Sequence, residues 1–99
     1  MARPWRLRLE PSHAAGPLQA MPPEPRKAME KALASLVEDP SGKRSGLDVR
    51  RLTATPGTNV YRVRVGEWRA AFLLRGRAIE VVRVFHRSEG YSWLERAYP

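Results

Sequence analysis

Residues 60–74 read VYRVRVGEWRAAFLL, and this stretch decides the fold. Two strand-like runs flank Gly66-Glu67, which is the pattern of two half-buried strands joined by a two-residue turn. A glycine at the first turn position favours a type II′ hairpin. Because such a turn fixes the register of the two strands, Arg64 is predicted to lie directly opposite Arg69.

The predicted hairpin has one apolar face and one basic face, because side chains alternate along a strand. The apolar face is expected to join the core, and it comprises Tyr61, Val63, Val65, Trp68, Ala70, Phe72 and Leu74. The basic face carries Arg62, Arg64 and Arg69 around the small Ala71. Opposed like charges destabilise a sheet, and a bound phosphodiester would offset that repulsion. The alternative is a solvated face on which the arginine stems cover apolar surface.

One strand and two helices are predicted before the hairpin. Trp5–Leu9 alternates apolar and basic residues, as a half-buried strand does. Residues 12–21 have room for a short helix that Gly16-Pro17 interrupts. A longer helix opens at the prolines of residues 22–25 and ends at Asp39-Pro40. Its apolar stripe is expected to cover the hairpin, and comprises Ala28, Met29, Ala32, Leu33, Leu36 and Val37.

A third strand over Ala78–His86 is predicted to extend the hairpin into a meander. Residues 47–52 are ambiguous, residues 53–59 are predicted to form a turn, and residues 89–98 a short terminal helix. The sequence therefore predicts an α+β fold with residues 1–99 in one domain. It comprises an N-terminal strand, two helices of which the first is short or broken, and a three-stranded antiparallel meander with the helices on one face.

The connection at Arg75–Arg77 decides which face of the meander receives Arg83. A three-residue loop places Arg83 opposite Arg69, whereas a two-residue loop places it on the apolar face. Burying a lone arginine is costly, so the three-residue loop is favoured. In this register His86 points away from the basic face, which favours a packing role over a chemical one.

The charge of the chain points to nucleic acid. The formal net charge is +8, and ten arginines lie between residues 44 and 87 against three acidic residues. Arginines interleaved with aromatic residues are typical of a nucleic-acid surface, and a merely solvated basic surface is the alternative.

Cysteine is absent and there are two histidines, so no disulfide scaffold, metal or other cofactor is expected. No apolar run reaches the length of a membrane span, and the first residues lack the apolar region of a signal peptide. We therefore expect a cytoplasmic protein with no membrane contact.

The motif YRVRVGEWR at residues 61–69, followed by VVRVFHR at residues 81–87 and then Tyr91, resembles the RelE-type toxins of the RelE/ParE toxin–antitoxin superfamily. The proline-flanked helix of residues 21–40 agrees with this resemblance. The resemblance implies a RelE-like fold and a ribosome-dependent mRNA endoribonuclease that inhibits translation. It also implies cleavage without a metal, by attack of the 2′-hydroxyl on the adjacent phosphate. The implied partners are the ribosome, mRNA and a cognate antitoxin.

By position, the resemblance implies that Arg62 and Arg64 hold the mRNA backbone and that Arg69 stabilises the reacting phosphate. It implies that Arg87 assists charge stabilisation or protonation of the leaving group, and that Tyr91 stacks on or orients the nucleotide. A packing role for Tyr91 at the end of the sheet stays open. The further candidates are His86 as a base, Arg83 at the margin of the site, and Arg50, Arg51 and Phe85 as RNA contacts.

Two departures from the family pattern bear on the chemistry. Both backbone-holding positions are arginine where some relatives carry a lysine, which leaves His86 and Tyr91 as the candidate bases. Phe85 stands where glycine is common in the family. Two other functions stay open: a ParE-like toxin that inhibits DNA gyrase, and a non-enzymatic basic nucleic-acid-binding module. The retained arginine set favours the nuclease.

Overall fold

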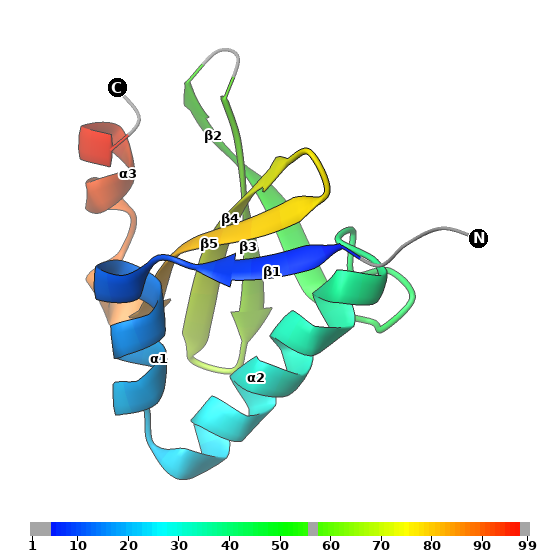
Figure 1. Ribbon diagram of the computed structural model, residues 1–99. Coiled ribbons are helices and arrows are strands. Elements are labelled where there is room, and N and C mark those ends of the chain that lie inside the picture. Colours follow the sequence, from blue (N-terminus) through cyan, green and yellow to red (C-terminus); the bar gives the residue numbers. More distant parts are fainter. Residues whose placement is uncertain (1–4, 56–57, 98–99) are drawn as a thin grey trace.

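The computed structural model describes residues 5–55 and 58–97, and within them five strands form one mixed sheet in the order β1-β5-β4-β3-β2 (Figure 1). The strands are β1 (Arg6–Leu9), β2 (Asp48–Thr55), β3 (Thr58–Val65), β4 (Trp68–Arg75) and β5 (Ala78–His86). β1 runs parallel to β5, and the remaining neighbours are antiparallel. The helical elements are a π-helical turn η1 (Pro11–Ala15), α1 (Gly16–Ala20), α2 (Pro23–Glu38), a 3-10 turn η2 (Arg87–Glu89) and α3 (Ser92–Ala97).

The β3–β4 hairpin has the predicted register. Arg64 lies opposite Arg69, and Tyr61 lies opposite Phe72. Gly66 has a φ of 61°, and every described residue other than glycine has a negative φ. Glu67 therefore has a negative φ, which is the combination that a type II′ turn requires. The prediction drawn from Gly66-Glu67 is confirmed.

The meander has four strands rather than the three predicted. β2 pairs with β3 from Asp48 opposite Arg64 to Leu52 opposite Val60. The turn predicted over residues 53–59 is wrong in part, because strand residues lie on both sides of Pro56-Gly57, which itself lies outside the described residues. β2 is an edge strand, and edge strands tolerate charged side chains on both faces, so its sequence lacks a clear alternation.

The connection between β4 and β5 corrects the predicted three-residue loop. Arg75 pairs with Ala78, so the turn has two residues. The pairing then shifts between Ala71 and Phe72, because Ala71 is opposite Arg83 whereas Phe72 is opposite Val81. This β-bulge adds one residue to β5 and returns Arg83 to the basic face, as predicted, although opposite Ala71 and not opposite Arg69.

The two predicted helices are present. α2 spans Pro23–Glu38 with Asp39 as its C-terminal cap, close to the predicted limits. The expected interruption at Gly16-Pro17 is a change from π-helical to α-helical geometry, in which the Gly16 amide donates to the Pro11 carbonyl. Proline cannot donate a backbone hydrogen bond, so a change of helix type at this position is compatible with Pro17. No helix in the described part of the chain is long and apolar enough to cross a membrane.

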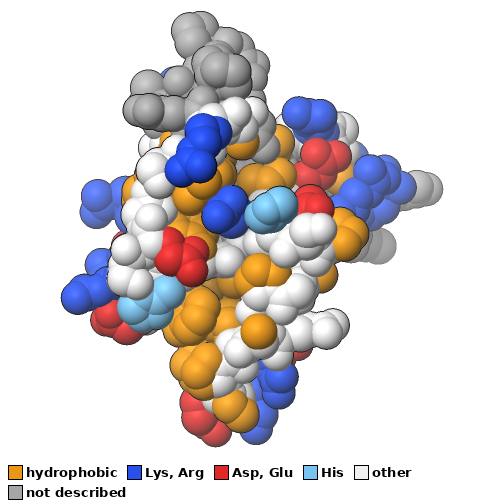
Figure 2. Space-filling model, turned by 90° about the vertical axis from the view of Figure 1, so that its left-hand side faces the viewer, with side chains coloured by type: hydrophobic (Ala, Val, Ile, Leu, Met, Phe, Trp, Pro, Cys, Tyr) orange, Lys and Arg blue, Asp and Glu red, His pale blue; other side chains and the backbone are white. Residues whose placement is uncertain are grey.

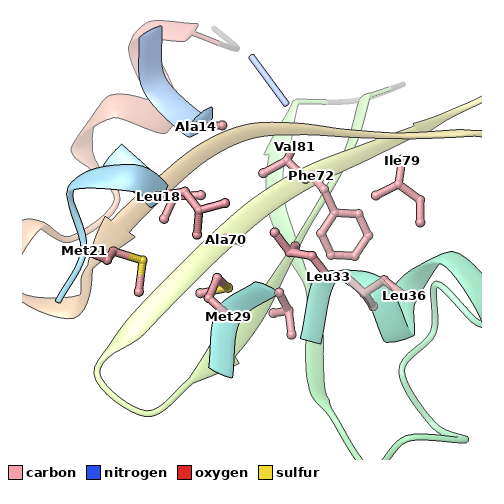
Figure 3. Close-up of a cluster of buried hydrophobic side chains, with 12 residues drawn as sticks. Ala14, Leu18, Met21, Met29, Leu33, Leu36, Ala70, Phe72, Ile79 and Val81 are labelled. Carbon is pink, nitrogen blue, oxygen red and sulfur yellow. The ribbon is translucent and has the colours of Figure 1, made fainter. Parts of the chain in front are cut away.

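Two hydrophobic clusters lie on opposite faces of the sheet. The first packs α1 and α2 against the predicted apolar face, and Figure 3 shows Phe72 of β4 directed toward Leu33 and Leu36 of α2. The predicted placement of these two helices on one face is therefore confirmed. The second cluster packs α3 against the other face and comprises Val60, Ala71, Leu73, Phe85, Trp93 and Leu94. The face that carries the arginines is consequently covered in part by its own small core.

The first cluster gives a direct test of the fold. Phe72 is fully buried and stacks on Tyr61 with ring centroids 5.6 Å apart. We expect Phe72→Ala to lower the free energy of unfolding by about 3–5 kcal/mol, because the cavity is lined by atoms that relax only in part. Urea denaturation measures this change. Lys27→Ala on the exposed face of α2 is the control, and an equal loss in both variants would contradict the role assigned to Phe72.

Candidate functional site

The β3–β4 turn gathers two of the predicted site arginines. The Arg64 Nε donates to the Gly66 carbonyl over 3.4 Å, and the Arg69 Nη1 donates to the same carbonyl over 3.3 Å. Arg69 Nη1 also reaches the Trp68 carbonyl over 3.4 Å. The opposed guanidinium groups thus share a neutral acceptor that offsets only part of their repulsion. Their remaining hydrogen-bond donors suit an anion at this end of the sheet.

A third predicted arginine is anchored to the same turn. Arg87 Nε lies 2.8 Å from Glu67 Oε2, and the Arg87 amide donates to the Glu67 carbonyl over 2.8 Å. Both side chains are more than half exposed. The start of η2, directly after β5, is in this way held against the β3–β4 turn, and Arg87 lies at the edge of the surface formed by Arg64 and Arg69.

His86 acts on this arrangement from the other face of the sheet, as predicted. It pairs with Trp68 of the apolar face, and the two rings meet edge to face with centroids 5.2 Å apart. The Ser88 amide donates to His86 Nδ1 over 3.2 Å, so the ring caps the turn η2 that carries Arg87. This geometry gives His86 a positioning role for the backbone after β5.

Tyr91 contacts the basic face through Phe85. Phe85 lies opposite Arg69 on β5 and is 1% exposed, held between Tyr91 and Trp93 at centroid distances of 5.4 Å each. The buried Phe85 ring has no face open to a base in this conformation. Tyr91 is 36% exposed, and its edge-to-face contact with Phe85 fixes the ring near the end of the sheet. Packing and nucleotide contact are therefore compatible roles for this one side chain.

Arg62 differs from its neighbours because it is buried and paired with a carboxylate. Only 8% of the residue is exposed, and its Nη1 donates to the Asp48 carbonyl over 2.9 Å and lies 3.2 Å from Asp48 Oδ1. Partial desolvation is the largest single influence on the pKa of Asp48 and raises it, whereas the hydrogen bond and charge of Arg62 lower it. With the charges of Arg50 and Arg64 added, the pKa of Asp48 lies below its ordinary value.

The remaining candidates divide between the two faces. Arg50 is opposite Arg62 in the sheet and lies 3.5 Å from Asp48 Oδ1, so it borders the basic face. Arg51 is opposite Tyr61 and therefore lies on the helix-bearing face, apart from the other arginines. Arg83 is on the basic face with its guanidinium 5.1 Å from the centre of the Trp93 ring, a cation–π contact.

Two clefts adjoin these residues. One of about 440 Å³ lies between α2 and the β3–β4 turn, where Asp48, Arg64 and Gly66 line it. Another of about 640 Å³ lies between η1, β5 and α3, with Arg83 and His13 in its wall. Figure 2 shows the side of the molecule that carries α1 and α3, where charged and histidine side chains surround a band of hydrophobic ones. The first cleft borders the turn that holds Arg64 and Arg69.

Sequence reasoning missed Asp48. It stands at the start of β2, a strand that the sequence left ambiguous, and its register position opposite Arg64 follows only from the β2–β3 pairing. The signal was present in the short alternation of Asp48, Arg50 and Leu52, which share one face once the strand is recognised. Without that strand, Arg62 had no visible counter-ion.

The fold and these contacts define a small basic α+β protein with a cluster of arginines at one end of its sheet. A family model described as the ParE toxin of the type II toxin–antitoxin system parDE matches residues 19–91. The chain belongs to this family, within the RelE/ParE superfamily of type II toxins. A comparison with curated proteins gives no match.

Solved structures share the fold. A chain of the archaeal RelE–RelB complex from Pyrococcus horikoshii OT3 is 20% identical, with 87% of this chain and 98% of that chain covered and a TM-score of 0.70. A chain of the RelB–RelE complex from Methanococcus jannaschii is 23% identical, with 87% and 96% covered and a TM-score of 0.69. A chain of the RelBE2 complex from Mycobacterium tuberculosis is 18% identical, with 85% and 99% covered and a TM-score of 0.60.

The lowered pKa of Asp48 predicts a pH-dependent contribution to stability. Because the folded-state pKa lies below the ordinary value of 3.8, this contribution is complete above pH 3.8 and is lost as the pH falls through the lower folded value. We expect Asp48→Asn to be less stable than the wild type at pH 7 and the difference to shrink at strongly acidic pH. Urea denaturation at several pH values measures it, and a difference that grows on acidification would contradict the ion pair.

Proposed function

We propose that this protein is a ribosome-dependent mRNA endoribonuclease that inhibits translation. The observation that carries the proposal is the meeting of Arg64, Arg69 and Arg87 at the β3–β4 turn, with Tyr91 held nearby against Phe85. Three permanently charged guanidinium groups at one exposed end of a sheet suit the phosphates of a nucleic-acid backbone, because a guanidinium group can donate two parallel hydrogen bonds to one phosphate. The position of these residues in the family motif supports the same assignment.

In the proposed reaction the ribose 2′-hydroxyl attacks the adjacent phosphorus and gives its proton to water. The bond from phosphorus to the 5′-oxygen of the next nucleotide breaks, the 5′-oxygen takes a proton from water, and a 2′,3′-cyclic phosphate is left. Negative charge builds up on the phosphate oxygens in the transition state, and Arg69 with Arg64 would stabilise it. Arg87 would stabilise charge at the leaving oxygen. Arginine remains protonated at neutral pH, so these residues supply charge and orientation and do not remove the 2′ proton.

Neither Asp48 nor His86 is well suited as a general base. The lowered pKa of Asp48 makes its carboxylate a weak proton acceptor, and His86 caps a turn on the far face of the sheet. Catalysis by positioning therefore fits this chain better than catalysis by a strong base. That requirement supports dependence on the ribosome, which would hold the mRNA in an orientation ready for attack.

A cognate antitoxin is part of the proposal. The three solved structures compared above are toxin–antitoxin complexes. A net charge of +8 favours an acidic antitoxin segment as the partner of this surface. Because the proposed activity acts on translating ribosomes, the proposal includes a cytoplasmic location.

Inhibition of DNA gyrase is the second candidate, because the matching family model is that of a ParE toxin. A DNA supercoiling assay with purified gyrase separates the two. Loss of supercoiling activity together with intact mRNA would replace the nuclease proposal with gyrase inhibition. Intact mRNA with undisturbed supercoiling and salt-dependent RNA binding would indicate a non-enzymatic binding protein.

Arg69 gives the sharpest test of the nuclease. We expect Arg69→Ala to reduce mRNA cleavage by about 100-fold or more, as removal of one transition-state donor does. The assay is cell-free translation followed by primer extension on the mRNA. Arg75→Ala is the matched control, because Arg75 lies on the same strand at its far end and pairs with Glu80. Undiminished cleavage by Arg69→Ala would remove Arg69 from the reaction.

Tyr91 separates ring stacking from hydroxyl chemistry. A stacked ring contributes about 1–3 kcal/mol per base, so Tyr91→Ala is expected to slow cleavage by about 5- to 150-fold. Tyr91→Phe keeps the ring and its contact with Phe85, and we expect it to stay within about threefold of the wild type on the same stacking argument. The same primer-extension assay measures both variants. Equal losses in the two would assign the role to the hydroxyl instead.

A further inference from the structure

Asp48 is an acidic side chain placed within a surface of arginines. Its Oδ1 lies 3.2 Å from Arg62 Nη1 and 3.5 Å from Arg50 Nε, and in the sheet Asp48 is directly opposite Arg64. Its side chain is 41% exposed, whereas that of Arg62 is 10% exposed. The carboxylate therefore occupies the solvent-facing side of Arg62, which is the side from which an anion would approach.

We propose that Asp48 is a built-in competitor for the substrate phosphate: its carboxylate occupies the anion position beside Arg62, and single-stranded RNA must displace it to engage that arginine. This inference deepens the proposed function and rests on RNA being the ligand of the basic surface. Arg64 and Arg69 bind neutral backbone carbonyls, so they meet the phosphate first. Arg62 contacts the phosphate only after the phosphate has replaced the Asp48 carboxylate.

The geometry allows the exchange without unfolding. Asp48 lies on the edge strand β2 with its side chain 41% exposed, and Arg64 is directly opposite it in the sheet, so a ligand at Arg64 reaches the carboxylate from solvent. Arg62 Nη1 keeps its hydrogen bond to the Asp48 backbone carbonyl at 2.9 Å, which does not depend on the carboxylate. The guanidinium therefore stays anchored while its ionic partner changes.

The exchange has a consequence for affinity and for its salt dependence. A phosphodiester and a carboxylate each carry one negative charge. Arg62 therefore pairs with one negative charge both before and after the exchange, and the exchange adds no net neutralisation of charge. Binding to the wild type should therefore release about one counter-ion fewer than binding to a chain with a neutral residue at position 48. By competing at Arg62, Asp48 lowers the affinity of the protein for polyanions and so reduces nonspecific binding of RNA.

The test compares Asp48→Asn with Glu80→Gln. Both substitutions replace a carboxylate with the matching amide and change the net charge equally. Glu80 pairs with Arg8 at 3.9 Å and Arg75 at 3.7 Å, and it lies near the β4–β5 turn at the far end of the sheet. The probe is a fluorescent 2′-O-methyl RNA oligonucleotide, which lacks the attacking hydroxyl and so reports binding alone.

We expect Asp48→Asn to bind this probe about three- to tenfold more tightly at 100 mM salt, and Glu80→Gln within about twofold of the wild type, because only Asp48 competes at the site. The plot of log affinity against log salt should steepen by about 0.7 for Asp48→Asn, the value for one phosphate of a single strand. Fluorescence anisotropy at several salt concentrations gives both quantities, and circular dichroism verifies folding.

Two further variants test whether Asp48 acts through Arg62. Asp48→Glu retains the charge and should bind with affinity close to that of the wild type. Adding Asp48→Asn to Arg62→Met should give no gain in affinity, because the position for which carboxylate and phosphate compete is gone. Circular dichroism verifies that the Arg62→Met background is folded.

Several results would overturn the proposal. They are equal gains in Asp48→Asn and Glu80→Gln, weaker binding by Asp48→Asn, or no probe binding by any variant at low salt. A gain that survives in the Arg62→Met background would also refute it. Failure of the nuclease proposal looks different, because mRNA would then stay intact in translation while the Asp48→Asn difference in binding persisted.

Discussion

The two-residue turn at Gly66-Glu67 is the constraint on which the rest of the structure depends. A type II′ turn leaves no freedom in the pairing of β3 with β4, so Arg64 and Arg69 are forced to lie opposite each other. The same turn supplies the Gly66 carbonyl that both arginines bind and the Glu67 carboxylate that anchors Arg87. The local geometry that sets the register therefore also assembles the charged surface.

The hairpin, its faces and the covering helices were predictable because each rests on local sequence. Gly66 fixes the turn, and the stripe on α2 has helical spacing that includes Met29, Leu33 and Leu36. The register of β5 was not predictable, because it combines a short turn with a bulge at Val82, and the two shifts compensate. The sequence pattern predicts the face that Arg83 occupies, but it does not predict the turn length and the bulge that place it there.

The site was predictable as a set of residues but not as an arrangement. The arginine positions follow from strand alternation, whereas the partners of those arginines come from strands that pair only in three dimensions. Asp48 reaches Arg62 across the β2–β3 pair, and Phe85 reaches Arg69 across the β4–β5 pair. The terminal helix adds a second core through Trp93 and Leu94, and this core buries Phe85 and leaves Tyr91 at its exposed margin.

Arg62 and Arg64 are two residues apart on one strand and share a face, but they differ in burial and in their ionic partners. Arg64 is close to the turn, where the sheet ends and the guanidinium remains in solvent, whereas Arg62 lies further along β3, beside the core formed with α3. A guanidinium at that depth needs a counter-charge, because burial of an unpaired cation is costly. Asp48 meets that need in this structure, and a phosphate would meet it in the proposed exchange. The requirement for a buried cation to be paired thus places an acidic residue inside a surface whose proposed ligand is itself an anion.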